Sequence, residues 1–211
     1  MIARPQKSFA GCLIGALLLA VVSAGCGAAN RSTESTPAVQ TGAGGFAGAA
    51  LPSGLPAPLV RLRDQTGHST SLAALRGQVT IVAFLYTRCG PPCTVIAQQI
   101  RGALDDLGAP VPVLIVSADP AADTPASVQR FLARVGLAGR VRFLTGARPQ
   151  LEVAWRAFHV MPPSARRGAF GRSAPVYVLD RAGRPRVIFQ LEQLTPEGLA
   201  HDVRAVQSTR H

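Results

Sequence analysis

The chain has 211 residues, of which 22 are basic and 11 acidic, so its formal net charge is +11. Hydrophobic residues make up 47% of the chain, enough for a domain with a substantial core. The excess charge has two open interpretations: an arginine-rich composition without function, or a basic surface near anionic lipid head groups. Basic and aromatic residues do not interleave, which argues against nucleic-acid binding.

Residues 1–25 have the pattern of a lipoprotein signal peptide. Arg4 and Lys7 precede an uncharged apolar stretch, 9–24, which is shorter than the roughly 20 residues that span a bilayer. The small residues before Cys26 resemble a bacterial lipobox, in which this cysteine is acylated and becomes the mature N-terminus. The pattern predicts an extracytoplasmic protein anchored to the cell membrane by lipid. An ordinary cleaved signal or a short uncleaved anchor is the alternative.

The rest of the chain divides into a linker and one domain. Residues 26–54 are rich in Ala, Gly, Ser, Thr and Pro and contain few large apolar residues, which predicts a flexible tether. Residues 55–211 are long enough for a single domain with its own core. We expect a monomer, because no pattern indicates a dimer seam.

Hydrophobic periodicity within the domain predicts alternating strands and helices. A hairpin is expected first, and a second hairpin and a helix close the domain. This order implies an α/β fold with a mixed sheet covered by helices on both faces. The expected elements are a hairpin over 59–62 and 69–72, a strand over 79–86, a helix over 92–107, a strand over 111–117, a helix over 125–135 capped by Thr124, a strand over 141–144, a helix over 145–158, a hairpin over 176–180 and 185–190, and a helix over 196–207.

Two cysteines lie where the first long strand gives way to a helix. Cys89 and Cys93 are expected near the helix N-terminus, where free amides and the helix dipole favour a thiolate. A thiolate is both a nucleophile and a ligand for soft metals. If Cys12 leaves with the signal and Cys26 takes lipid, only this pair stays free. Outside the cytoplasm it can form a disulfide unless it is reduced or holds a metal.

Four groups of residues around and after the cysteines resemble the Sco/SenC family. The resemblance implies a thioredoxin-like fold with an N-terminal β-hairpin extension. It also implies an extracytoplasmic protein that helps to assemble the binuclear copper site of cytochrome c oxidase. Such a protein delivers copper or keeps the cysteines of an oxidase subunit reduced. The matching segments are 84–89 with Cys93, 116–120 with 123–125, 143–146, and 176–180 with Gly183.

The family's metal ligands are two cysteines and a histidine, and this chain departs from that set. Where the resemblance places the histidine, the sequence has Arg172, which stays protonated and cannot bind a metal. Two thiolates alone suit Cu(I), whereas Cu(II) would lose an imidazole ligand. His159 and Met161 lie upstream and are candidates for a third ligand. For His159, the other interpretation is a surface residue at a helix end.

Other residues near the expected site have more than one interpretation. Arg172 beside the sulfurs would favour thiolates and disulfide exchange, or it is a solvated loop residue. Pro175 is similar to the cis-proline opposite the cysteines of thioredoxin-like reductases, although trans is the default. Asp119 and Asp123 match the family pattern, but a turn and a helix start account for them without function.

Two functions remain open, and both use Cys89 and Cys93. The first is a copper chaperone that holds Cu(I) through the two sulfurs. The second is a copper-independent thiol-disulfide oxidoreductase, in which Cys89 attacks and Cys93 resolves the mixed disulfide. A cysteine-containing protein is the expected partner in either case.

Overall fold

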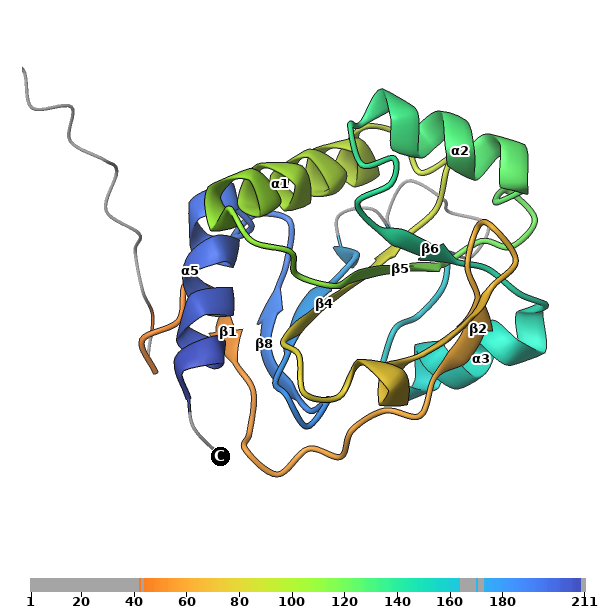
Figure 1. The fold of residues 1–211 in the computed structure, drawn as a ribbon. Coiled ribbons are helices and arrows are strands. Elements are labelled where there is room, and N and C mark those ends of the chain that lie inside the picture. Colours follow the sequence, from red (N-terminus) through yellow and green to blue (C-terminus); the bar gives the residue numbers. More distant parts are fainter. Residues whose placement is uncertain (1–41, 43, 164–169, 171–172, 210–211) are drawn as a thin grey trace, which may run out of the picture. The chain divides into compact units, whose positions relative to one another are not determined.

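The computed structural model describes residue 42, residues 44–163, residue 170 and residues 173–209. The predicted signal peptide, Cys26 and Arg172 lie outside the described residues. Every described element lies within the compact unit Pro37–His211. This unit is built on a six-stranded sheet with the strand order β1-β8-β7-β4-β5-β6 (Figure 1), and β2 and β3 form a separate two-stranded sheet.

The predicted hairpins, strands and helices are all present, with ends that shift by a few residues. The strands are β1 (Ala49–Ala50), β2 (Arg61–Arg63), β3 (Ser69–Ser71), β4 (Thr80–Leu85), β5 (Val113–Ser117), β6 (Arg142–Leu144), β7 (Val176–Leu179) and β8 (Pro185–Phe189). The helices are the 3-10 helix η1 (Leu72–Leu75), α1 (Pro91–Leu107), α2 (Pro125–Arg134), α3 (Arg148–Ala157) and α5 (Pro196–Ser208).

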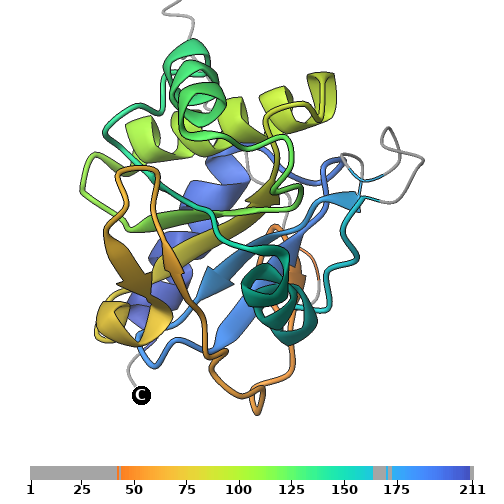
Figure 2. The same ribbon diagram turned by 90° about the vertical axis from the view of Figure 1, so that its right-hand side faces the viewer.

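The sheet is mixed, as the sequence predicts. Strand β4 is parallel to β5 and antiparallel to β7, and every one of its residues is buried. A strand covered on both faces needs a continuous apolar sequence, which is what residues 79–86 provide. Helices α1 and α2 lie on one side of the sheet and α3 on the other (Figures 1 and 2). The cysteine loop runs from the carboxyl end of β4 to the start of α1.

Local sequence signals account for the helix ends. The side chain of Thr124 caps α2 by accepting a hydrogen bond from the Ser127 amide at 3.2 Å, and Pro125 takes the first helical position. Gly108 ends α1 in the left-handed conformation. The predicted Thr124 cap is confirmed.

Aromatic side chains fill the core on the α3 side. The rings of Phe84, Phe158 and Tyr177 pack together with centroids 5.0 to 6.3 Å apart. The Tyr177 hydroxyl donates to the Phe158 carbonyl at 2.6 Å, and burial raises the pKa of Tyr177 to about 12. Trp155 is buried, and its Nε1 donates to the Ser117 carbonyl at 3.0 Å.

The tether predicted over 26–54 is wrong at its carboxyl-terminal end. Strand β1 pairs with β8, and the amides of Ala47 and Gly48 donate to the fully buried carboxylate of Asp202 on α5 at 2.8 and 2.9 Å. A Cβ on Gly48 would lie 2.7 Å from Val187 Cγ1, so only glycine fits this approach. The folded domain therefore begins before residue 55, whereas residues 26–41 lie outside the described part of the chain.

We expect Asp202→Ala to lower the free energy of unfolding by about 2–4 kcal/mol, because it leaves two partly or fully buried amides without their acceptor. Urea denaturation of Pro37–His211 measures this, and hydrogen exchange should show faster exchange of the Ala47 and Gly48 amides. Asp106→Ala is the control. It removes an exposed carboxylate that pairs with Arg204, which lies on α5 like Asp202. Equal losses in both variants would contradict this role of Asp202.

Candidate functional site

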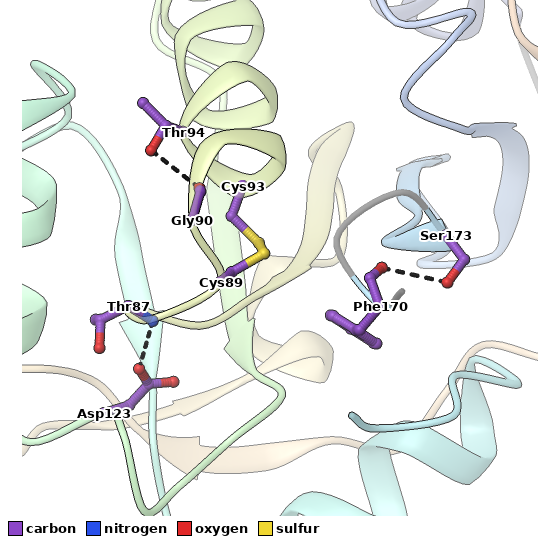
Figure 3. Close-up of a disulfide and its surroundings, with 8 residues drawn as sticks. All are labelled: Thr87, Cys89, Gly90, Cys93, Thr94, Asp123, Phe170 and Ser173. Atoms are coloured by element: carbon purple, nitrogen blue, oxygen red, sulfur yellow. Dashed lines mark hydrogen bonds between the residues drawn. A yellow bond between two sulfur atoms is a disulfide. The ribbon is translucent and has the colours of Figure 1, made fainter. Parts of the chain in front are cut away.

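The loop between β4 and α1 brings the two cysteines together. They form a disulfide with their Cα atoms 5.7 Å apart (Figure 3). Cys89 is 8% exposed, and its amide donates to the Tyr86 carbonyl at 3.2 Å, which closes the turn. Cys93, in the first turn of α1, is fully buried. Solvent therefore reaches the pair from the Cys89 side.

The start of α1 offers the sulfurs few amide donors. Gly90 is the N-cap residue, and Pro91 and Pro92 follow it without N–H groups. Cys93 is thus the first residue of α1 that has an amide hydrogen. The helix dipole still favours negative charge at this end. Several free amides were expected to stabilise a thiolate here. Within α1, only the helix dipole and the Cys93 amide can do so near the sulfurs.

Gly90 has a backbone conformation that other residues rarely adopt. Its φ is 82° and its ψ −154°, a region almost restricted to glycine. A Cβ added here would meet no atom within 4 Å, so the cost of a side chain would lie in the backbone alone. This conformation sets the direction in which the chain passes from Cys89 to Cys93.

We expect Gly90→Ala to destabilise the protein by about 1–3 kcal/mol through that backbone strain. Gly54→Ala is the matched control, because Gly54 also has open space around it but no positive φ. Thermal or urea unfolding compares the two variants, and Gly54→Ala should stay within about 0.5 kcal/mol of wild type. Similar values for both would show that the Gly90 conformation is not required.

A buried carboxyl holds the other side of the cysteine loop. Asp123 accepts hydrogen bonds from the Thr87 amide at 2.7 Å and from the Ser117 hydroxyl at 2.6 Å. The Thr87 hydroxyl donates to the Ala122 carbonyl at 2.9 Å. Burial raises the pKa of Asp123 to about 6, against the lowering effect of these hydrogen bonds. Asp123 thus fixes the backbone two residues before Cys89.

The role of Asp123 was missed in the sequence, where a helix start accounted for it. Thr124 is the residue that caps α2, so the carboxyl of Asp123 has no capping task. That redundancy is the signal that could have identified it. Asp119 behaves as predicted for a turn, because its carboxylate accepts from the Ala121 amide and its carbonyl from the Ala122 and Asp123 amides.

Phe170, which comes before β7 in the chain, lies across from the disulfide (Figure 3). Phe170 is buried, and its ring lies 5.8 Å from the ring of Tyr86, centroid to centroid. The Ser173 hydroxyl donates to the Phe170 carbonyl at 3.2 Å. No sequence pattern points to Phe170, because a lone aromatic residue has no periodicity to support it.

Pro175 lies directly before β7, and its carbonyl accepts a hydrogen bond from the Phe84 amide at 3.3 Å. No peptide bond among the described residues is cis, so the trans default holds at this proline. Pro175 therefore supports the strand beside β4 rather than presenting a cis bond to the sulfurs.

His159 does not complete a three-residue metal site within the part of the chain that is described. It is exposed at the end of α3, with a φ of 54°, and its amide donates to the Arg156 carbonyl at 3.2 Å. Among the described residues, no group of three or more His, Cys, Asp or Glu side chains could hold a metal ion. Met161 is 85% exposed. The sulfur pair is the soft ligand set that the described site offers.

A family model described as SCO1/SenC matches residues 59–208, which include the cysteine loop and Phe170. The chain belongs to the SCO1/SenC family. A search of curated protein sequences found no significant match. No helix among the described residues is long and apolar enough to cross a membrane.

Solved structures of Sco proteins have the same fold, which is thioredoxin-like. BsSco, described as a member of the Sco family of cytochrome c oxidase assembly proteins with a disulfide switch, has 21% identity and a TM-score of 0.64 over 75% of this chain and 97% of its own. Apo Sco1 from Thermus thermophilus has 22% identity and a TM-score of 0.63, over 76% and 96%. Copper-bound ScoI from Bradyrhizobium japonicum has 26% identity and a TM-score of 0.55, over 71% and 98%.

Proposed function

We propose that this chain is an extracytoplasmic protein, anchored to the cell membrane through lipid on Cys26. Its Cys89/Cys93 dithiol binds copper, maintains thiols, or does both while the copper site of cytochrome c oxidase is assembled. The observation that carries the proposal is the pairing of the two sulfurs at the start of α1 in an SCO1/SenC domain. Cytochrome c oxidase assembly by BsSco and copper binding by the Bradyrhizobium protein support it.

The donor chemistry of the site fits Cu(I) as cargo. Reduction of the disulfide leaves two sulfurs whose Cα atoms are 5.7 Å apart, and two thiolates suit a soft ion that accepts few ligands. The protein supplies a fixed loop, held by Gly90 and by Asp123, and a largely buried surrounding. Copper bound there would be passed to sulfur ligands of an oxidase subunit.

A copper-independent thiol-disulfide oxidoreductase is the second candidate. It is favoured by the lack of a third ligand among the described residues, together with Arg172 at the place of the family's histidine. In this function a partner thiolate attacks Cys89 Sγ, the Sγ–Sγ bond breaks, and Cys93 leaves as a thiolate. A second partner thiol then releases Cys89, so the partner is oxidised and this pair reduced. In the reverse direction the reduced pair reduces a partner disulfide, and a dithiol donor must restore it.

Copper titration of reduced Pro37–His211 tests the proposal and separates the two candidates. Competition with a Cu(I) chelator should show one tightly bound Cu(I) that is lost in Cys89→Ser and in Cys93→Ser. Cu(II) binding should be weak and should rise in Arg172→His, which restores an imidazole at the family position. If wild type binds neither ion while Arg172→His gains binding, the copper function fails and the redox function stands. If wild type also exchanges no disulfide with thiol peptides, both candidates fail.

A further inference from the structure

A hollow lined by three arginines lies against the cysteine loop, at Thr87 and Arg88. It has a volume of about 260 Å³ and is formed by the cysteine loop and one face of α2. Its lining residues are Thr87, Arg88, Ser127, Arg130, Phe131 and Arg134. Arg88 is the residue directly before Cys89 and is exposed, as are Arg130 and Arg134. Three arginines thus line one hollow that begins at the residue before Cys89.

No carboxylate of the described residues forms an ion pair with these three arginines. The ion pairs of the described residues involve other arginines, such as Arg140, Arg148 and Arg204. The buried carboxyl of Asp123 accepts a hydrogen bond from the Thr87 backbone and forms no ion pair with an arginine of the hollow. Arg130 and Arg134 are four residues apart on α2, a spacing at which like charges destabilise a helix. The end of Arg134 lies over the Phe131 ring, 5.6 Å from its centroid, which helps to hold it in the hollow.

The distance from the hollow to Cys89 limits what can occupy both. Thr87 and Arg88 lie within two residues of Cys89, so their Cα atoms are at most about 7.6 Å from that of the cysteine. An extended peptide advances about 3.3 Å per residue. A carboxylate two or three residues from a substrate cysteine can therefore reach the arginines while its sulfur lies at Cys89 Sγ.

We propose that this hollow, the arginine hollow, binds an acidic side chain of the cysteine-containing protein on which the Cys89/Cys93 pair acts. Guanidinium groups pair with carboxylates through charge-assisted hydrogen bonds, and charges at the rim of an interface increase the association rate and set the partner's orientation. This deepens the proposed function and rests on it for the identity of the partner. It assigns the partner's chemistry: Asp or Glu two or three residues from the reacting cysteine.

The test uses Pro37–His211 and two sets of short peptides. In the binding set, serine replaces the cysteine, and Glu, Gln or Lys stands two or three residues from it, so that association is measured without exchange. In the exchange set the same peptides carry cysteine, and the rate of opening of the Cys89–Cys93 disulfide is followed. The variant is Arg130→Glu with Arg134→Glu, and Arg130→Gln with Arg134→Gln is a second variant that adds no negative charge. Arg76→Glu with Arg184→Glu is the control, because both residues are exposed and lie outside the hollow.

Wild type and control should bind the Glu peptide about five- to tenfold more tightly than the Gln peptide. Their disulfide should also open about five- to tenfold faster with the Glu peptide. Salt should reduce both preferences. The Arg130/Arg134 variants should lose the preference, and the glutamate variant should favour the Lys peptide. Equal binding of the three peptides by wild type, or the same preference in variants and control, overturns the proposal. The proposal also fails if Arg130 and Arg134 are needed for binding to anionic lipid vesicles while wild type shows no preference among the peptides. Absence of exchange with retained Glu-peptide binding would count against the redox function alone.

Discussion

Cys89→Ser and Cys93→Ser are expected to abolish disulfide exchange, but in different ways. With Cys93 replaced, Cys89 can still attack a partner disulfide, and the mixed disulfide cannot be resolved, so a covalent complex accumulates. With Cys89 replaced, the remaining Cys93 is fully buried and no complex forms. Turnover should fall at least ~100-fold in both variants, because each removes half of the reacting unit.

Non-reducing gels and mass spectrometry with a disulfide-bonded substrate peptide measure this asymmetry. Pro37–His211 holds no cysteine besides Cys89 and Cys93. The double variant Cys89→Ser, Cys93→Ser should therefore form no disulfide-linked complex, and it serves as the control. A complex trapped by Cys89→Ser but not by Cys93→Ser would reverse the assignment of attacker and resolver. Such a result would also mean that the burial of Cys93 does not protect it in solution.

Asp123 is expected to make stability depend on pH. Its pKa is about 6 in the folded protein and 3.8 in the unfolded chain, so the folded state binds the proton more tightly. The stability that protonation provides is therefore present at low pH and is lost as the pH rises from about 4 to about 6. Two pKa units correspond to about 3 kcal/mol. Asp123→Asn removes this titration, so wild type should lose about 3 kcal/mol relative to the variant across that range.

Urea denaturation of both proteins at a series of pH values gives the difference, in which the titration of all other groups cancels. Asp105→Asn removes an exposed carboxylate on α1 and controls for the loss of one negative charge. Asp123→Asn also changes the acceptor of the Thr87 amide, two residues before Cys89. A difference between wild type and Asp123→Asn that does not change with pH contradicts the raised pKa.

The sequence predicted the parts of the fold that have periodic or capping signals. The apolar run that becomes β4 and the Thr124-Pro125 start of α2 are local patterns, and the structure confirms both. Strand β1 was missed because Ala49 and Ala50 have no alternation, and its place depends on Asp202, which is more than 150 residues away in the chain. No local pattern can report such a contact.

The same reasoning applies to the site. The position of Cys89 and Cys93 at the end of a buried strand followed from sequence, since strand, loop and helix are contiguous. The hydrogen bonds of Asp123 to Thr87 and Ser117 depend on how β4 and β5 align, and the arginine hollow depends on how α2 lies beside the loop. Both required the tertiary structure. The prediction at Arg172 lies outside the described residues and stays a prediction.

The most direct test of the proposed function is the copper content and activity of cytochrome c oxidase in cells. A strain that lacks this gene would be complemented with wild type, with the Cys89→Ser, Cys93→Ser double variant, or with the Arg76→Glu, Arg184→Glu control. We predict that wild type and control restore oxidase activity and the copper of its binuclear site, while the double cysteine variant resembles the deletion. Full restoration by the double cysteine variant would contradict the account.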